Sequence, residues 1–198
     1  MTEIKLRRAG PDHAGAIADI HIASWRETYA AMMPAETLAG LDPGEWAQRW
    51  RANLSDDDPA TATLLAEDAD GPAGFGLCRR QRSEKLLPLG FFGEITSLYL
   101  LRRIQRRGAG RRLLAEMAGH LLAHGCDSAA VWVFRIAAHA RAFYEAHGAE
   151  PTGVAGVWEI YGMVLPDMAY GWRDLRRIAP EGLTCGDSVP TLHGGGNG

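Results

Sequence analysis

A glycine-containing segment among arginines is the part of this sequence whose residue types could most directly do chemistry. It runs from Gln105 to Gly110 and stands where an apolar, strand-like run gives way to a helical pattern. Backbone N–H groups at a helix N-terminus have no intrahelical partner and carry a partial positive charge, so anions bind there. The glycines at 108 and 110 would let a phosphate approach the backbone closely. The segment therefore predicts a site for a ligand that carries a pyrophosphate.

Arginines surround this turn on a chain whose formal net charge is −3. They occupy positions 102, 103, 106, 107, 111 and 112 and are expected to steer an anionic ligand. The turn is not a Walker A loop, because Gly-Lys-Ser/Thr is absent, and Leu113 stands where a dinucleotide fingerprint would have its third glycine. By itself, so short a pattern is equally compatible with an ordinary helix N-terminus and a solvated arginine face.

The elements that must position this segment follow from hydrophobic periodicity. In the first half of the chain we expect a strand over 2–9, a helix over 11–29, and a second helical stretch over 34–50, interrupted near 42–44. Two strands, 62–67 and 73–80, are joined by an Asp70-Gly71 turn, which is a hairpin signal. Residues 81–90 are expected to form an irregular connection.

The second half of the chain continues with a buried strand and a strong β-α-β unit. We expect strands over 91–101, 129–134, 154–160 and 163–170, and helices over 108–125 and 138–147. The order β-α-α-β-β-β-α-β-α-β-β predicts a mixed α/β (α+β) fold with a central run of antiparallel strands.

Composition narrows the class of protein. The chain has 198 residues, 46% hydrophobic and 23% charged, which favours one ordinary globular domain and argues against global disorder. Cys78, Cys126 and Cys185 lie too far apart for a zinc ribbon or a disulfide framework. We expect a single domain over residues 1–177 and a flexible, glycine-rich tail over residues 178–198.

Two further features bear on location and partners. The charged N-terminus lacks the apolar core of a signal peptide, and no run of about 18 apolar residues occurs. The negative net charge argues against a nucleic-acid-binding polycation. We therefore expect a cytoplasmic protein with no membrane partner and no nucleic-acid partner.

Three segments together resemble the GNAT superfamily of N-acetyltransferases, of the small bacterial type. The family signature is L-Y-V, then Q/R-x-x-G-x-G/A with a long helix, then A-x-x-F-Y-x-x-x-G-F. The matching segments are Leu98 to Leu100, Gln105 to Gly110 and Ala140 to Gly148. Ser24 to Tyr29 and Leu165 to Tyr170 look like the first helix and last strand of such members, so the resemblance spans about residues 2–172.

The resemblance implies a GNAT-like, mostly antiparallel sheet flanked by helices, with acetyl-CoA as donor and no metal. It implies that backbone groups near Leu98 hold the pantetheine arm and that the arginine-rich turn holds the pyrophosphate. The implied cofactor-binding residues are Leu98, Tyr99, Leu100, Gln105, Arg106, Arg107, Gly108, Ala109, Gly110, Arg111, Ala137, Ala140 and Phe143. Ala137 departs from the asparagine often found there, and Arg106 from a glycine.

The implied reaction is direct attack of a primary amine, from a small molecule or a peptide N-terminus, on the thioester. An alkylammonium must first lose a proton, and Glu94 is the candidate base. Tyr144 is the candidate acid for the departing thiolate. Glu94 could instead be a strand-end carboxylate paired with solvent or an arginine, and Tyr144 could be a core residue. Candidate acceptor-binding residues are Trp25, Tyr29 and Met33, with core filling as the alternative for the first two.

Other interpretations stay open. Ala137 favours a non-catalytic acyl-CoA sensor of the same fold, and transfer of a longer acyl group is a further alternative. His120 and His124 have the spacing of a metal pair but lack a third ligand, which favours two solvated histidines. Trp46 and Trp50 suit the core or an oligomer contact, and a homodimer is possible through the terminal strands.

Overall fold

The computed structural model describes residues 3–30, 33–160 and 162–180, and its elements follow the predicted order. The strands are β1 (Lys5–Arg8), β2 (Ala62–Asp68), β3 (Gly71–Arg80), β4 (Gly93–Leu100), β5 (Ala129–Phe134), β6 (Glu150–Ile160) and β7 (Met163–Trp172). The α-helices are α1 (Ala14–Tyr29), α2 (Ala35–Ala39), α3 (Pro43–Leu54), α4 (Ala109–Ala123) and α5 (Ala138–Ala146). The interrupted second helical stretch is thus two helices, and Asp42 caps α3 by accepting from the Glu45 N–H at 2.8 Å.

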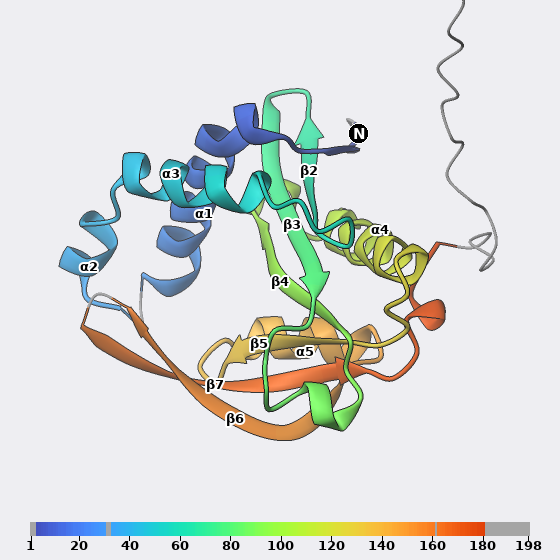
Figure 1. Cartoon of the computed structure of the whole chain (residues 1–198). Coiled ribbons are helices and arrows are strands. Elements are labelled where there is room, and N and C mark those ends of the chain that lie inside the picture. The colour runs from blue at the N-terminus through green and yellow to red at the C-terminus, as the bar shows by residue number, and fades with distance from the viewer. Residues whose placement is uncertain (1–2, 31–32, 161, 181–198) are drawn as a thin grey trace, which may run out of the picture.

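The strands form one seven-stranded sheet in the order β1-β2-β3-β4-β5-β7-β6. Every neighbouring pair is antiparallel except β4 and β5, which run parallel. The predicted mixed, mostly antiparallel sheet is therefore confirmed. In Figure 1, β3 and β4 run steeply while β5, β6 and β7 cross below them, so the sheet divides into two halves at the β4–β5 junction.

The two halves of the sheet meet over a very short distance. Strands β4 and β5 pair only at Gly93↔Ala129 and Glu94↔Ala130 and then diverge. A Cβ atom at Gly93 would lie 3.0 Å from the Ser128 carbonyl oxygen and 3.2 Å from the Ala129 Cβ. The absence of a side chain at this position therefore allows the strands to touch before they part, and the rest of β4 has an unpaired edge toward β5.

Helices cover both faces of the β2–β4 half. Helices α1 and α3 pack on one face, and Phe75 points toward them, with its ring centroid 4.8 Å from that of Trp50. Helix α4 packs on the other face, where a Cβ at Gly76 would meet the Met117 side chain at 2.8 Å. Helix α5 lies against the other half of the sheet, where Tyr144 packs edge-on against Trp172 at 5.8 Å.

The last residues that the structure describes pack against the domain. Ile178 and Ala179 pack against the core, and their N–H groups donate to the Leu175 carbonyl at 3.1 and 3.0 Å. Both residues belong to the predicted tail of residues 178–198, whose flexibility stays a prediction, and residues 181–198 lie outside the described residues. Within the described ranges, no helix has the length and apolar character needed to cross a membrane.

Replacing Gly93 with alanine should destabilise the protein by about 1–3 kcal/mol, because the added methyl group meets backbone that cannot move aside cheaply. Thermal unfolding measures this as a lower melting temperature, by about 2–4 °C per kcal/mol for a chain of this size. Gly15→Ala in α1 is the matched control, since a Cβ there meets nothing within 4 Å and alanine favours a helix. A Gly93→Ala protein as stable as the parent would contradict the close approach of β4 and β5.

Candidate active site

A cavity of about 1090 Å³ occupies the opening between the two halves of the sheet. Helices α1 and α3 contribute His21, Tyr29, Trp46, Arg49, Trp50 and Asn53, and the loop after β3 contributes Arg82 to Lys85. Strands β4 and β5 contribute Thr96 to Tyr99 and Val131 to Phe134. The remaining walls include Ala137, Ala140 and Tyr144 beside or on α5, Ala155 to Trp158 on β6, and Asp167 on β7. The cavity is large enough to hold a small ligand almost entirely.

The open edge of β4 offers backbone hydrogen-bonding groups to this cavity. The Leu101 N–H donates to the Ala73 carbonyl on β3 at 2.8 Å, so strand alternation turns the backbone of Leu98 and Leu100 away from β3. The Gln105 Nε2 amide donates to the Leu100 carbonyl at 2.8 Å and occupies one of these groups. Gln105 therefore closes the end of β4, and Leu98 remains on the edge that lines the cavity.

The turn before α4 has the backbone conformation of an anion-binding loop. Arg106 has a φ of 58° and Gly108 a φ of 81°, and Arg106 is the one non-glycine residue with positive φ in the described chain. Left-handed residues next to a helix start point successive N–H groups to one side. The first regular helical hydrogen bond at the start of α4 runs from the Arg112 N–H to the Gly108 carbonyl, at 3.1 Å. The N–H groups before Arg112, in the first turn of the helix, therefore have no helical acceptor. The strain at Arg106 is consistent with a functional constraint.

The arginines around this turn divide into two groups. Arg102 donates to the Glu27 carbonyl at 2.7 Å, Arg103 pairs with Asp68 at 3.2 Å, and Arg112 donates to the Ile4 carbonyl at 2.5 Å. These three tie the turn to α1, the β2–β3 hairpin and the β1 end. Arg106 and Arg111 are exposed and make no ion pair or hydrogen bond within the part of the chain that the structure describes. The expected ring of six steering arginines is therefore partly a set of structural ties.

Three tyrosines face one another across the cavity. Tyr29 on α1, Tyr99 on β4 and Tyr144 on α5 all line it. Burial raises the pKa of each phenol, and the neighbouring Tyr99 and Tyr144 raise the pKa of Tyr29 further. At neutral pH all three therefore keep their protons and act as hydrogen-bond donors.

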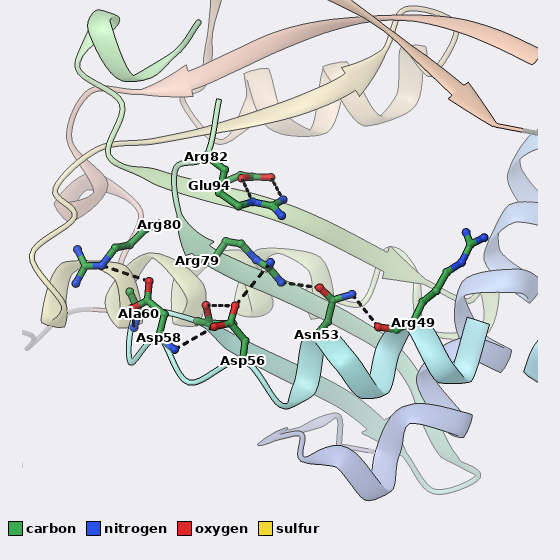
Figure 2. Close-up of polar contacts among 10 residues, drawn as sticks. Arg49, Asn53, Asp56, Asp58, Ala60, Arg79, Arg80, Arg82 and Glu94 are labelled. Atoms are coloured by element: carbon green, nitrogen blue, oxygen red, sulfur yellow. Dashed lines mark hydrogen bonds and ion pairs between the residues drawn. The ribbon is translucent and has the colours of Figure 1, made fainter. Parts of the chain in front are cut away.

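Glu94 belongs to the last residue pair between β4 and β5, and its carboxylate is bound by Arg82. Arg82 Nε donates to one oxygen at 3.2 Å and Nη2 to the other at 3.1 Å, as Figure 2 shows. Arg82 lines the cavity, whereas Glu94 is 7% exposed and is not one of the lining residues. The geometry thus matches the alternative expectation of a strand-end carboxylate paired with an arginine, and the carboxylate adjoins the cavity through that guanidinium.

His21 stands in a cage of aromatic rings at the α1–α3 wall. Its ring centroid lies 4.3 Å from those of Trp46 and Tyr99 and 5.7 Å from that of Trp50. The Trp50 indole N–H donates to Nδ1 at 3.2 Å, which assigns the proton of the neutral ring to Nε2. Burial lowers the pKa of His21 to about 3, so the ring is neutral at physiological pH.

Comparison with known proteins identifies the family. Residues 22–149 match the acetyltransferase (GNAT) family. The uncharacterized N-acetyltransferase YuaI of Bacillus subtilis is 34% identical over 176 residues, which cover 88% of this chain and 96% of the relative. The chain belongs to the GNAT family. The resemblance inferred from the sequence is confirmed, and the protein is an N-acetyltransferase by class.

Solved structures agree on the fold. A GCN5-related N-acetyltransferase from Rhodopseudomonas palustris superposes with a TM-score of 0.66 at 21% identity, covering 86% of this chain and 96% of its own. The acetyltransferase yncA from Salmonella typhimurium, solved with acetyl-CoA, superposes with a TM-score of 0.60 at 17% identity, covering 87% and 94%. The seven-stranded sheet with its β4–β5 opening is thus the GNAT fold.

Of the three predicted cofactor-binding residues beside or on α5, two line the cavity and one packs between helices. Ala137 and Ala140 line the cavity, and Ala137 begins α5 without a side-chain cap. Phe143 does not line it but packs against α4, where a Cβ at Gly110 would come within 3.2 Å of its ring. Gly110 thus admits Phe143 between the two helices, and the contact of Phe143 with the cofactor stays a prediction.

Of the three predicted acceptor-binding residues, one lines the cavity and two do not. Tyr29 lines the cavity of this GNAT protein, whereas Trp25 is completely buried and Met33 is 5% exposed, and neither lines it. Trp25 packs edge-on against Tyr29, Trp46 and Trp158, as expected for the core-filling alternative, and its contact with an acceptor stays a prediction.

Several lining residues were not predicted to lie in a site. Trp46 and Trp50 belong to the core, as one of the two expectations had it, and they also line the cavity together with Arg49 and Asn53. Their spacing on successive turns of α3 is a readable signal, as is His21 one turn before Trp25. His120, by contrast, lies 3.0 Å from the Pro59 carbonyl oxygen, and the described residues hold no group of three metal-binding side chains.

Burial of His21 should make the stability of the protein depend on pH. Below pH 6.5 the unfolded chain protonates His21 while the folded ring resists until about pH 3, so the stabilisation is complete above pH 6.5 and is lost as pH falls. Urea unfolding at several pH values should show His21→Asn with a slope between pH 6 and 4.5 that is lower by about 1.4 kcal/mol per pH unit.

His120 provides the matched comparison for that measurement. Its pKa is lowered to about 4, mainly by burial, so His120→Asn should reduce the slope in the upper part of the same window. A His21→Asn protein with the parent slope would contradict a buried, neutral imidazole at position 21.

Proposed function

We propose that this GNAT protein transfers the acetyl group of acetyl-CoA to the primary amine of a small molecule or a peptide N-terminus, by direct attack while both substrates are bound. The observation that carries the proposal is the single cavity that joins the open β4 edge at Leu98, the Tyr144 phenol and the α1–α3 wall. One ligand can enter along the edge and another along the wall. Acetyl-CoA in the yncA structure is consistent with the first.

The residues of this chain fit the donor at two places. The Leu98 backbone, turned away from β3, would hydrogen-bond the amides of the pantetheine arm. The left-handed turn at Arg106 and Gly108 would bind the pyrophosphate through N–H groups of the first α4 turn. A second cavity, of about 420 Å³ and lined by Gly108, Arg111 and Arg112 among others, adjoins that turn. Bound acetyl-CoA supplies the activated thioester.

Tyr144 is the proposed acid. As the amine nitrogen bonds to the carbonyl carbon and the carbon–sulfur bond breaks, negative charge develops on sulfur. Burial raises the pKa of the Tyr144 phenol, so it is protonated at neutral pH and would donate a hydrogen bond to that anion as the thiolate leaves. Its position on the cavity wall supports this role over a purely structural one.

Glu94 remains the proposed proton acceptor, and its pairing with Arg82 defines how it would act. Because Arg82 lines the cavity and Glu94 does not, the proton would reach the carboxylate through a water beside the guanidinium.

The competing proposal is a GNAT-fold sensor that binds acyl-CoA without turnover. Ala137 supports it, since α5 begins without the side-chain cap that an asparagine would supply. Binding with no thiol release for any primary amine would favour the sensor.

Gly108→Asp should abolish binding of acetyl-CoA in a calorimetric titration. A carboxylate about 4 Å from a phosphate oxygen costs about 4 kcal/mol at an effective dielectric constant of about 20, which corresponds to about a thousandfold in Kd. Gly125→Asp is the control, because Gly125 has nearly the same φ, 79°, at the other end of α4. Parent-like binding by Gly108→Asp would refute the phosphate turn, and equal binding of NADH and acetyl-CoA would contradict a site selective for acetyl-CoA.

The proposed roles of Tyr144 and Glu94 in proton transfer should be distinguishable by the pH dependence of the two variants. Tyr144→Phe should lower kcat by about 10²–10⁴ with little change in acetyl-CoA affinity, and the defect should persist at high pH. Glu94→Gln should give a defect that shrinks as pH approaches the pKa of the amine, because solvent then deprotonates it. Thiol release with a panel of primary amines measures both.

Tyr170→Phe serves as the control for the first substitution. The Tyr170 hydroxyl donates to Glu145 at 2.7 Å, and Tyr170 does not line the cavity, so turnover should stay near the parent value. Parent-like turnover of Tyr144→Phe would remove that phenol from the mechanism.

A further inference from the structure

Helix α3 presents a stripe of four residues to the cavity on the side away from the open β4 edge. Trp46, Arg49, Trp50 and Asn53 lie on successive turns and all line it. Asn53 is held in place, since its side-chain oxygen accepts from Arg79 Nη2 at 2.8 Å and its amide donates to the Arg49 carbonyl at 3.2 Å. The stripe is therefore a fixed surface that a second substrate would meet.

Arg49 is the unusual member of this stripe. Its guanidinium carbon lies 5.6 Å from the centroid of the Trp46 ring, and Figure 2 shows the side chain extending away from the neighbouring ion pairs. The nearby arginines are engaged, Arg79 with Asn53 and Asp56 and Arg82 with Glu94. Over the described ranges, the Arg49 guanidinium has no ion pair or hydrogen bond. A cation on a cavity wall, oriented by an indole and unpaired, is suited to a ligand anion.

The other charges around the cavity limit that anion to a single negative charge. Arg82 is neutralised by Glu94, and Lys85 lies close enough to Asp167 to offset part of the rise that burial causes in the pKa of that carboxyl. Glu84, which also lines the cavity, would repel a dianion. Because the other charges around the cavity offset one another, the single guanidinium of Arg49 matches the one negative charge of a carboxylate better than the two of a phosphate monoester.

The surface beside Arg49 is aromatic. Trp46 and Trp50 are 6% and 4% exposed, and what remains open of them lines the cavity together with Tyr99. His21 fixes two of these rings, because it accepts the Trp50 N–H and packs at 4.3 Å against Tyr99. Since the His21 ring is neutral, the aromatic surface beside Arg49 carries no charge of its own. It is suited to an aromatic or large aliphatic group.

We propose that the acceptor is a primary amine bearing one carboxylate and an aromatic or large apolar side chain, the chemical class of the aromatic amino acids, with Arg49 binding the carboxylate and Trp46 and Trp50 contacting the side chain. This inference rests on the proposed function, because it names the acceptor of the same transfer. Arg49 is then a specificity-determining residue outside the proton-transfer steps.

The test compares matched amines with and without the carboxylate. Thiol release from acetyl-CoA is measured with L-phenylalanine against phenethylamine and with L-tryptophan against tryptamine. The parent enzyme should prefer the carboxylate-bearing member by about 10- to 100-fold in kcat/KM, as expected for one hydrogen-bonded charge pair. Arg49→Gln should bring that ratio close to one, chiefly through KM, and Arg49→Lys should restore part of it.

Arg51→Gln is the matched control. Arg51 lies on the same helix, is exposed and does not line the cavity, so this variant should keep the parent ratio. Equal rates for both members of each pair, or a ratio that Arg49→Gln leaves unchanged, would overturn the inference while the transferase function stands. Peptide amines preferred over free amino acids would overturn it in the same way. No thiol release with any amine, despite acetyl-CoA binding, would instead refute the proposed function itself and the inference with it.

Discussion

The two-residue contact between β4 and β5 is the constraint on which the rest of the structure depends. If the strands paired along their full length, the sheet would be continuous and the backbone of Leu98 would be hydrogen-bonded to β5. Pairing that ends at Glu94 and Ala130 instead leaves an unpaired strand edge inside the protein. Buried backbone groups need partners, so the opening is a place where a ligand with amide groups is favoured. The proposed binding of acetyl-CoA therefore depends on this interruption of the sheet.

The arginine-rich turn combines observed structural contacts with the proposed binding of the pyrophosphate. Arg102, Arg103 and Arg112 tie the turn to the first helix, a hairpin and the N-terminal strand, and so hold the start of α4 in place. That rigidity maintains the left-handed Arg106, whose conformation costs about 1–2 kcal/mol relative to a right-handed one. Charge alone would suggest that all the arginines face a phosphate. Their contacts indicate that half of them prepare the backbone to do so.

The sequence was sufficient for the order of elements, the family and the β4-to-α4 segment, because hydrophobic periodicity and the glycine-arginine motif are local signals. It was insufficient for the acceptor side. Trp25 and Trp46 lie on amphipathic helices with similar spacing, yet one is completely buried and the other lines the cavity. Periodicity identifies the inward face of a helix but not whether that face meets side chains or a cavity. Likewise, the spacing around Glu94 carries no information about Arg82, twelve residues earlier, which the β3–β4 turn brings to it.

The titratable groups of the cavity suggest that its environment contributes to the deprotonation of the amine. Burial raises the pKa of Tyr29, Tyr99 and Tyr144 and lowers that of His21, so each is held in its neutral form. The same desolvation acts on any amine that enters and lowers its pKa, because the charged form loses hydration there. A weaker base then suffices, which is compatible with the proposed role of Glu94 as proton acceptor although its carboxylate is paired with Arg82.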